Sequence, residues 1–179
     1  MNIIETGIEG LIVIEPRVFG DERGYFFESY NQQKFSELGL NYNFVQDNQS
    51  FSVYGVVRGL HFQRAPFAQA KLVRALQGKV MDVAVDIRKN SPTYGQVYSC
   101  ELSDENKRQM LIPRGFAHGF SVLSKTAIFS YKCDNFYSKQ HEGGICFNDP
   151  NLAIDWGLPQ ADMLFNNRDA DFPNLSKIG

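Results

Sequence analysis

The sequence is short of cysteine, of net charge and of long apolar runs. Its three cysteines, Cys100, Cys133 and Cys146, are odd in number and widely spaced, which argues against a disulfide framework or a CxxC metal site. A formal net charge of -2 provides no broad basic surface for nucleic acid or an anionic membrane. No apolar run reaches the roughly 20 residues that span a bilayer, and residues 1–6 do not resemble a signal peptide. We therefore expect a cytoplasmic protein with no nucleic-acid or membrane partner.

The composition is that of an ordered globular protein. Of the 179 residues, 43% are hydrophobic and 21% are charged, which is close to the average for soluble domains. A chain of this length can bury one sizeable core. We expect a single domain over residues 1–179, with a tail from about residue 149 that packs on it as loops and short helices.

Short extended segments separated by turn residues dominate the sequence. Only residues 31–38 favour a helix, with Asn31 to cap its start, Phe35 and Leu38 on one face, and Gly39 to end it. Strand-like runs fall at residues 10–19, 25–30, 56–62, 70–76, 79–87, 96–102, 109–112, 119–123, 127–133 and 144–147. The pattern predicts an all-β sandwich, barrel or jelly roll.

Two details of pairing and burial can also be predicted. The Gln77-Gly78 dipeptide between two strand-like runs favours a tight hairpin turn. Residues 79–87 alternate between large apolar side chains and smaller or acidic ones such as Asp82 and Asp86. This alternation is typical of a strand with one buried face.

A histidine with two basic neighbours is the first candidate for chemistry. His61 lies in the run Arg58-Gly59-Leu60-His61-Phe62-Gln63, and Lys71 follows ten residues later. With an unperturbed pKa of about 6.5, a histidine can accept a proton near neutral pH. A nearby cation can stabilise negative charge on a substrate oxygen. Together they could remove a proton from carbon beside a ketone, although a lone histidine on an apolar strand can equally be structural.

A second histidine lies in a recognisable pattern. The run Pro113-Arg114-Gly115-Phe116-Ala117-His118 resembles the second motif of the cupin superfamily, P-x-G-x-x-H. Metal-binding cupins supply two histidines and a glutamate from the first motif. Here that stretch has one histidine, His61, and Lys71 lies roughly where the glutamate would be. A lysine would repel a metal ion, so the chain resembles a cupin that has lost its metal. The alternative for His118 is that it is a hydrogen-bonded histidine of the core.

The sequence as a whole resembles one family more closely. Seven motifs, in order and spacing, are similar to those of the dTDP-4-dehydrorhamnose 3,5-epimerases, and the resemblance runs from about residue 10 to residue 169. They are DERGYF at 21–26 with Glu28, VQDN at 45–48, RGLHFQ at 58–63, AQAKLV at 68–73, IPRGFAHGF at 112–120, YK at 131–132 with Tyr137, and DP at 149–150 with IDW at 154–156.

The resemblance implies a fold and a reaction. The fold would be a cupin-type jelly roll, and the enzyme a cofactor-independent isomerase, usually a homodimer. The reaction would invert C3 and C5 of dTDP-4-keto-6-deoxyglucose through enolates, in the synthesis of dTDP-L-rhamnose for surface polysaccharides such as lipopolysaccharide. No metal or other cofactor would be needed.

The resemblance also assigns catalytic roles. His61 would be the base, paired with Asp169, and Tyr131 would be the acid on the opposite face of the sugar. Lys71 would stabilise the enolate oxygen, and His118 would help to orient the sugar. Asp171, two residues after Asp169, is a rival for the same role.

The remaining carried-over residues would hold the nucleotide. Arginine guanidinium groups suit the two phosphates, and Arg168 stands where the family usually has lysine. Thymine would stack on Tyr137. The full set of substrate-binding candidates is Arg23, Glu28, Gln46, Asn48, Arg58, Lys71, His118, Tyr137, Glu142 and Arg168.

Three other functions remain open on the sequence. A 3-epimerase that acts at C3 alone would use the same base, acid and lysine. A metal-dependent cupin oxygenase would need stoichiometric iron. A non-catalytic sugar-binding module would keep the pocket without turnover.

Overall fold

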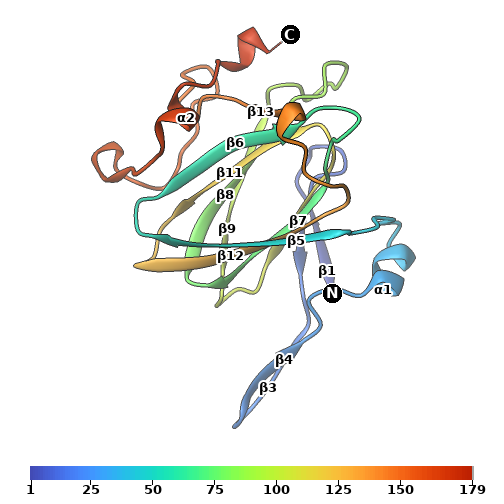
Figure 1. The fold of residues 1–179 in the computed structure, drawn as a ribbon. Coiled ribbons are helices and arrows are strands. Elements are labelled where there is room, and N and C mark those ends of the chain that lie inside the picture. Colours follow the sequence, from blue (N-terminus) through green and yellow to red (C-terminus); the bar gives the residue numbers. More distant parts are fainter. Residues whose placement is uncertain (179) are drawn as a thin grey trace.

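Two antiparallel sheets face each other in the computed structural model, which describes residues 1–178 (Figure 1). The larger sheet has six strands. In spatial order they are β1 (Asn2–Glu5), β2 (Ile12–Glu15), β10 (Gln109–Ile112), β7 (Lys71–Gln77), β12 (Thr126–Cys133) and β5 (Gln46–Val53).

The second sheet and the helices complete the fold. The second sheet has five strands. In spatial order they are β13 (Glu142–Gly144), β6 (Val57–Gln63), β11 (Phe116–Val122), β8 (Lys79–Asp86) and β9 (Val97–Ser103). The helices are short: α1 (Gln32–Glu37), η1 (Lys139–His141), η2 (Gln160–Asp162), α2 (Asn167–Ala170) and η3 (Leu175–Lys177). The expected all-β jelly roll is confirmed. Residues from 149 onward form loops and the short helices η2, α2 and η3. Within residues 1–178, no helix is long and apolar enough to cross a membrane.

The prediction of a hairpin at Gln77-Gly78 is wrong. Strand β7 pairs with β10 and β12, whereas β8 pairs with β11 and β9, so consecutive strands belong to different sheets. Gly78 does make the turn, with φ of +75°. A Cβ there would lie 2.1 Å from the carbonyl oxygen of Thr126. The turn therefore carries the chain across the core, which local turn chemistry does not reveal.

The one-sided burial expected for β8 is also wrong. Val83 and Val85 are buried as expected, but Asp82, Ala84 and Asp86 have no exposed surface either. The reason is that this strand lies inside its sheet and both of its faces are covered. Two acidic side chains therefore lie in the interior and need polar partners.

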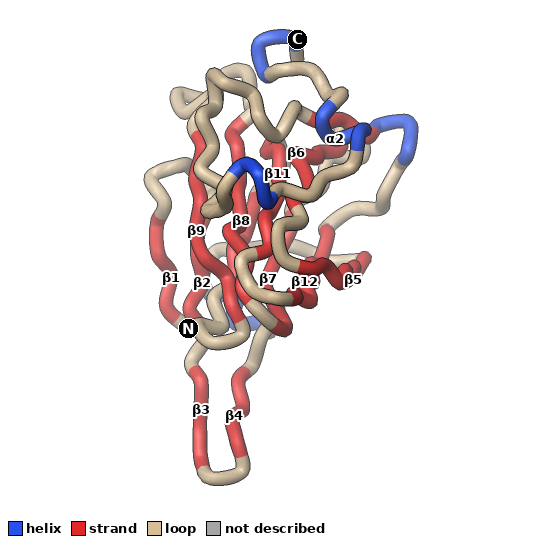
Figure 2. Tube along the Cα trace, turned by 90° about the vertical axis from the view of Figure 1, so that its left-hand side faces the viewer, coloured by secondary structure: helices blue, strands red, loops and turns tan. Residues whose placement is uncertain are grey.

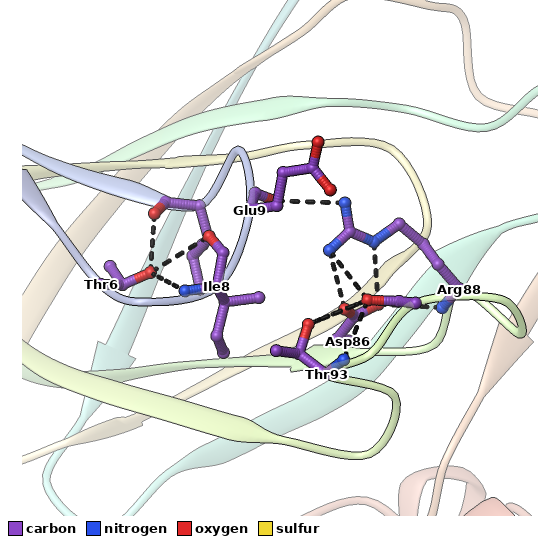
Figure 3. Close-up of polar contacts among 8 residues, drawn as sticks. Thr6, Ile8, Glu9, Asp86, Arg88 and Thr93 are labelled. Carbon is purple, nitrogen blue, oxygen red and sulfur yellow. Dashed lines mark hydrogen bonds and ion pairs between the residues drawn. The ribbon is translucent and has the colours of Figure 1, made fainter.

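Asp86 finds its partners in a polar cluster at the end of β8 (Figure 3). Its carboxylate accepts hydrogen bonds from the Arg88 guanidinium at 2.7 Å, from Ser91 at 2.6 Å and from Thr93 at 2.7 Å. Arg88 Nη1 also donates to the carbonyl of Glu9 at 3.1 Å. The cluster thus ties the loop before β2 to the barrel.

The local signals for helix α1 are confirmed in part. The Asn31 side chain accepts from the Lys34 N–H, and Gly39 adopts φ of +78° just past the helix end. Phe35 is buried as expected, but Leu38 is 44% exposed. The prediction that Leu38 shares the apolar face of the helix with Phe35 is therefore wrong. Leu38 is the C-cap residue and lies just past Glu37, the last residue of the helix.

A separate hairpin projects from the barrel. Strands β3 (Val18–Asp21) and β4 (Gly24–Phe27) pair only with each other and extend away from both sheets (Figure 2). Its aromatic side chains are open to solvent: Phe19 is 51% exposed, Tyr25 60% and Phe26 68%. The hairpin adds nothing to the core of its own chain.

Candidate active site

Two adjoining cavities open between the sheets. The inner one has a volume of about 290 Å³ and is lined by Asn48, Gln49, Ser50, Arg58, His61, Lys71, His118, Gly119, Phe120, Phe129 and Tyr131. The outer one, of about 250 Å³, is lined by Gln46, Asn48, His61, Phe62, Gln63, Gln69, Lys71, Tyr131, Tyr137 and Glu142. They share Asn48, His61, Lys71 and Tyr131, so they form one continuous space.

The two sheets supply opposite walls of this space. His61 comes from β6 of the five-stranded sheet, whereas Lys71 on β7 and Tyr131 on β12 come from the six-stranded sheet. The aromatic rings of Phe120 and Phe129, one from each sheet, stack with centroids 4.3 Å apart beside them. Residues distant in the sequence thus surround one small volume.

His61 is held by a buried carboxylate. Its Nε2 donates to Asp169 Oδ1 at 2.8 Å, and the Gly59 N–H donates to Asp169 Oδ2 at 3.1 Å. Burial alone would raise the pKa of Asp169, but these hydrogen bonds and the attraction of His61 hold that pKa below its usual value. Asp171, the rival in the sequence, is the exposed residue that ends α2.

Helix α2 sets the position of Asp169. The Asn166 side chain caps the helix by accepting from the Asp169 N–H at 2.8 Å. Asp169 itself is only 1% exposed. A four-residue helix with its own cap therefore delivers a carboxylate to the strand that carries His61.

Lys71 and Tyr131 lie together on the facing wall. The Lys71 Nζ is 5.7 Å from the centroid of the Tyr131 ring. Burial lowers the pKa of Lys71, and the nearby carboxylates of Asp82 and Glu142 act in the opposite direction. Burial raises the pKa of Tyr131, so the phenol keeps its proton near neutral pH.

His118 also has a carboxylate partner, which sequence reasoning missed. Its Nε2 donates to Asp82 Oδ1 at 2.8 Å, and both side chains are buried. Burial lowers the pKa of His118, while Asp82 favours its charged form. The other oxygen of Asp82 has no hydrogen-bond partner among the described residues. An acidic residue inside the apolar run 80–85 was the available signal.

Several candidates for nucleotide binding are joined at the mouth of the outer cavity. Arg168 donates to both oxygens of Glu142, at 2.8 and 3.2 Å, and the Tyr137 hydroxyl donates to the same carboxylate at 3.1 Å. The Gln46 side chain accepts from the Tyr137 N–H at 3.1 Å and donates to Asn48 at 3.1 Å. The mouth is therefore polar and charged, whereas the inner cavity has an aromatic side.

Comparison with known proteins identifies the family. The family model described as dTDP-4-dehydrorhamnose 3,5-epimerase matches residues 5–177. The dTDP-4-dehydrorhamnose 3,5-epimerase of Salmonella typhimurium is 55% identical over 178 residues, which is 99% of this chain and 97% of the relative. The chain belongs to the dTDP-4-dehydrorhamnose 3,5-epimerase family.

Solved structures of the family agree in fold over the whole chain. The epimerase from Elizabethkingia anophelis is 57% identical with a TM-score of 0.95, covering 99% of this chain and 98% of that one. The enzyme from Legionella pneumophila, solved with dTDP-4-keto-L-rhamnose, is 51% identical with a TM-score of 0.95 and coverage of 99% and 94%. The expectations of an isomerase and of a cupin-type jelly roll are thereby confirmed.

Most of the family's candidate residues line the cavity, and Asp169 and Arg168 are bonded to residues that line it. Two candidates do neither. Arg23 lies at the turn of the β3–β4 hairpin, where its side chain is 85% exposed and pairs with Asp21. Glu28 follows the hairpin and pairs with Lys34 at 2.8 Å. Neither lines the cavity of its own chain.

Among residues 1–178, no three His, Cys, Asp or Glu side chains are grouped as ligands for a metal ion. His61 and His118 instead each bind one carboxylate, and Lys71 lines the cavity beside them.

Proposed function

We propose that this epimerase inverts C3 and C5 of dTDP-4-keto-6-deoxyglucose in the cavity between its sheets, on the route to dTDP-L-rhamnose. One observation carries the proposal: an imidazole and a phenol line one cavity from opposite walls, with an ammonium group beside the phenol. The C4 carbonyl makes the protons on C3 and C5 acidic, because it can accept the charge as an enolate. The three groups match the three needs of that chemistry.

His61 takes the proton from carbon. Its Nε2 is engaged by Asp169, so Nδ1 is the nitrogen left to accept. As the C–H bond breaks, its electron pair moves to the C4 oxygen and the proton moves to Nδ1. The buried Asp169 carboxylate then stabilises the imidazolium and holds the ring in place.

Lys71 stabilises the enolate that results. Its ammonium group lies in a desolvated cavity, where a charge interaction is stronger than in water. A preorganised donor of this kind typically contributes about 10²–10³ in rate.

Tyr131 returns a proton to the other face of the same carbon. Its raised pKa keeps the hydroxyl protonated until the enolate carbon accepts the proton. The tyrosinate and the imidazolium then exchange protons with solvent, and the same sequence is repeated at the second carbon. No electrons are gained or lost overall, as an isomerisation requires.

The base of the nucleotide lies in the outer cavity, and Arg58 approaches the phosphates from the inner one. Arg58 and Arg168 hold the phosphates, thymine stacks on Tyr137, and Gln46, Asn48 and Glu142 complete the pocket, with His118 orienting the sugar. The polar mouth made by Tyr137, Glu142 and Arg168 supports this placement.

A homodimer would explain Arg23 and Glu28. Both lie on or beside a hairpin whose tip exposes aromatic side chains and whose strands pair with no strand of the two barrel sheets. Packing of that hairpin on a second copy would cover Phe19, Tyr25 and Phe26 and bring Arg23 and Glu28 to the partner's nucleotide. We further propose a cytoplasmic location, which the three free thiols support.

Incubation with dTDP-4-keto-6-deoxyglucose in heavy water tests the proposed reaction. We expect solvent deuterium at both C3 and C5, detected by NMR and mass spectrometry. Deuterium at C3 alone would identify a 3-epimerase instead. Bound substrate without label at either carbon would contradict the enolate mechanism and favour a binding module.

Two variants test the residue roles in the same assay. His61→Asn should slow exchange at both carbons by about 10²–10⁴-fold, and Tyr131→Phe should block inversion while exchange by His61 persists. His141→Asn and Tyr94→Phe, which change a histidine and a tyrosine outside the inner cavity, are matched controls and should react as wild type. If the His61→Asn variant turned over substrate as fast as wild type, His61 would be excluded as the base.

A further inference from the structure

A phenylalanine from the C-terminal segment lies against the ring of His61. The centroids of the Phe172 and His61 rings are 5.8 Å apart, and the planes meet at 74°, an edge-on contact. Phe172 follows helix α2, which supplies Asp169. One short segment therefore approaches the imidazole twice, with a carboxylate and with an aromatic ring.

A glycine makes room for this ring. Gly144 on β13 is directly opposite His61 on β6 in the sheet. A Cβ at Gly144 would lie 2.3 Å from two carbons of the Phe172 ring and 2.5 Å from a third. Phe172 can thus reach its position beside His61 only because the residue that pairs with His61 has no side chain.

The main chain around Phe172 is fixed on both sides. The Cys146 N–H donates to the carbonyl of Pro173 at 3.0 Å, and its Sγ lies 3.2 Å from the carbonyl oxygen of Ala170. Further on, the Leu175 N–H donates to the buried carboxylate of Asp149 at 2.7 Å. The ring is therefore placed by bonds to the strand β13 region and not by loose packing.

We propose that Phe172 is a positioning residue for His61, and that Gly144 is the residue that admits it. A single hydrogen bond from Nε2 to Asp169 fixes one atom of the imidazole but lets the ring swing about that contact. The edge of Phe172 blocks this movement, so Nδ1 stays directed at the substrate carbon. The proposal rests on the proposed role of His61 as the base.

The variant Phe172→Leu tests this with two independent measurements. We expect kcat to fall about 10–100-fold, because displacements near 1 Å can cost about 10² in rate. The Kd for dTDP should change much less, and only through Arg168, whose guanidinium carbon is 5.7 Å from the centroid of the Phe172 ring. In NMR spectra of protein labelled at histidine, the His61 ring signals should lose the shift caused by the neighbouring aromatic ring. Phe51→Leu, at a 61% exposed phenylalanine on β5, is the matched control and should change neither.

A double-mutant cycle tests the link between the two residues. Gly144→Ala alone should lower kcat about tenfold or more, because its Cβ displaces the Phe172 ring. Added to Phe172→Ala it should cost less than twofold, since no ring is left to displace. Additive losses would overturn the proposal. Phe172→Met, which keeps bulk without the ring, replaces Phe172→Leu in the kinetic and NMR measurements if Phe172→Leu does not fold.

Failure of this proposal can be told apart from failure of the proposed reaction. If His61→Asn is inactive but Phe172→Leu keeps full kcat, the positioning role is wrong and the base role stands. If Phe172→Leu shifts the His61 signals while His61→Asn turns over as wild type, the contact exists but His61 is not the base. A fall in kcat with unmoved His61 signals would also reject the positioning role.

Discussion

At the scale of single residues, two buried carboxylates on strand β8 (Lys79–Asp86) have different surroundings. Asp86 accepts hydrogen bonds from Arg88, Ser91 and Thr93, so its charge is fully compensated. Asp82 has one partner, the imidazole of His118, which lines the cavity. The first arrangement serves stability, and the second holds a side chain that lines the cavity.

The pH dependence of stability should reveal how much the Asp86 carboxylate contributes to the free energy of unfolding. Burial alone would raise its pKa, but the hydrogen bonds from Arg88, Ser91 and Thr93 hold that pKa well below its usual range. A carboxyl with a lowered folded-state pKa stabilises the protein above its unfolded pKa of about 3.9, and this contribution is lost as the pH falls further. Asp86→Asn should lower stability at pH 7 by about 3 kcal/mol.

Thermal unfolding measured by circular dichroism gives the comparison. For a chain of this size the loss at pH 7 corresponds to about 6–12 °C in Tm, and the difference from wild type should narrow below about pH 4. Asp47→Asn, at an exposed ion pair with Lys132, is the control and should cost less than about 1 kcal/mol. An equal difference at every pH would contradict the assignment to the Asp86 charge.

The sequence indicated which residues line the cavity and that His61 pairs with Asp169, but not that His118 pairs with Asp82. His61, Lys71, Tyr131 and His118 were found because their motifs match a family, and they do line one cavity. Asp82 was missed because its alternation with Val83 suggested a solvent-facing side chain. Nothing in the sequence places Phe172 near His61, since that contact depends on how the tail returns to β13.

At the scale of elements, the residue patterns of the sequence located most strands but did not show which strands pair with one another. Strand β10 (Gln109–Ile112) has the predicted bounds, and β12 (Thr126–Cys133) differs by one residue. Strand β5 (Gln46–Val53) was missed because its polar residues lack the apolar pattern of a strand. The turn at Gly78 was recognised, but which sheet the chain enters afterwards is decided by long-range packing.

The hairpin β3–β4 carries the prediction that belongs to this scale. If its aromatic surface packs on a second copy, Phe26→Asp should place a charge in an apolar interface and dissociate the dimer. Light scattering should show a dimer for wild type and a monomer for the variant, with activity reduced at least tenfold because Arg23 no longer reaches the partner's nucleotide. The circular dichroism spectrum should be unchanged, since the hairpin lies outside the core.

A matched variant keeps this experiment specific. Tyr94→Asp introduces the same charge at another exposed aromatic residue, 40% open to solvent and distant in sequence from the hairpin. It should remain dimeric and active. A wild-type protein that is monomeric and fully active at assay concentration would reject the dimer and with it the role of Arg23.

At the scale of the whole molecule, the cavity depends on both sheets at once. The walls come from β6 and β11 on one side and from β5, β7 and β12 on the other. A ligand that contacts both sheets binds the folded state alone. Binding and global stability are therefore linked.

Thermal shift with dTDP tests that linkage. At a concentration of 100 times its Kd, dTDP should add about 2.7 kcal/mol, which is about 5–11 °C in Tm for this size. Thymidine at the same concentration should shift Tm much less, because it offers nothing to the arginines. Arg168→Gln should reduce the shift with dTDP and leave that with thymidine unchanged. Equal shifts with both ligands would contradict phosphate binding by the arginines.

The stacked rings of Phe120 and Phe129 have a consequence for the chemistry beside them. One ring belongs to each sheet, and their separation of 4.3 Å is part of what sets the gap between the sheets. His61 and Tyr131 are attached to the same two sheets, so this pair of rings also helps to set the distance between the imidazole and the phenol. A smaller side chain at Phe120 or Phe129 should let the sheets approach and narrow the gap between His61 and Tyr131, and a larger one should widen it.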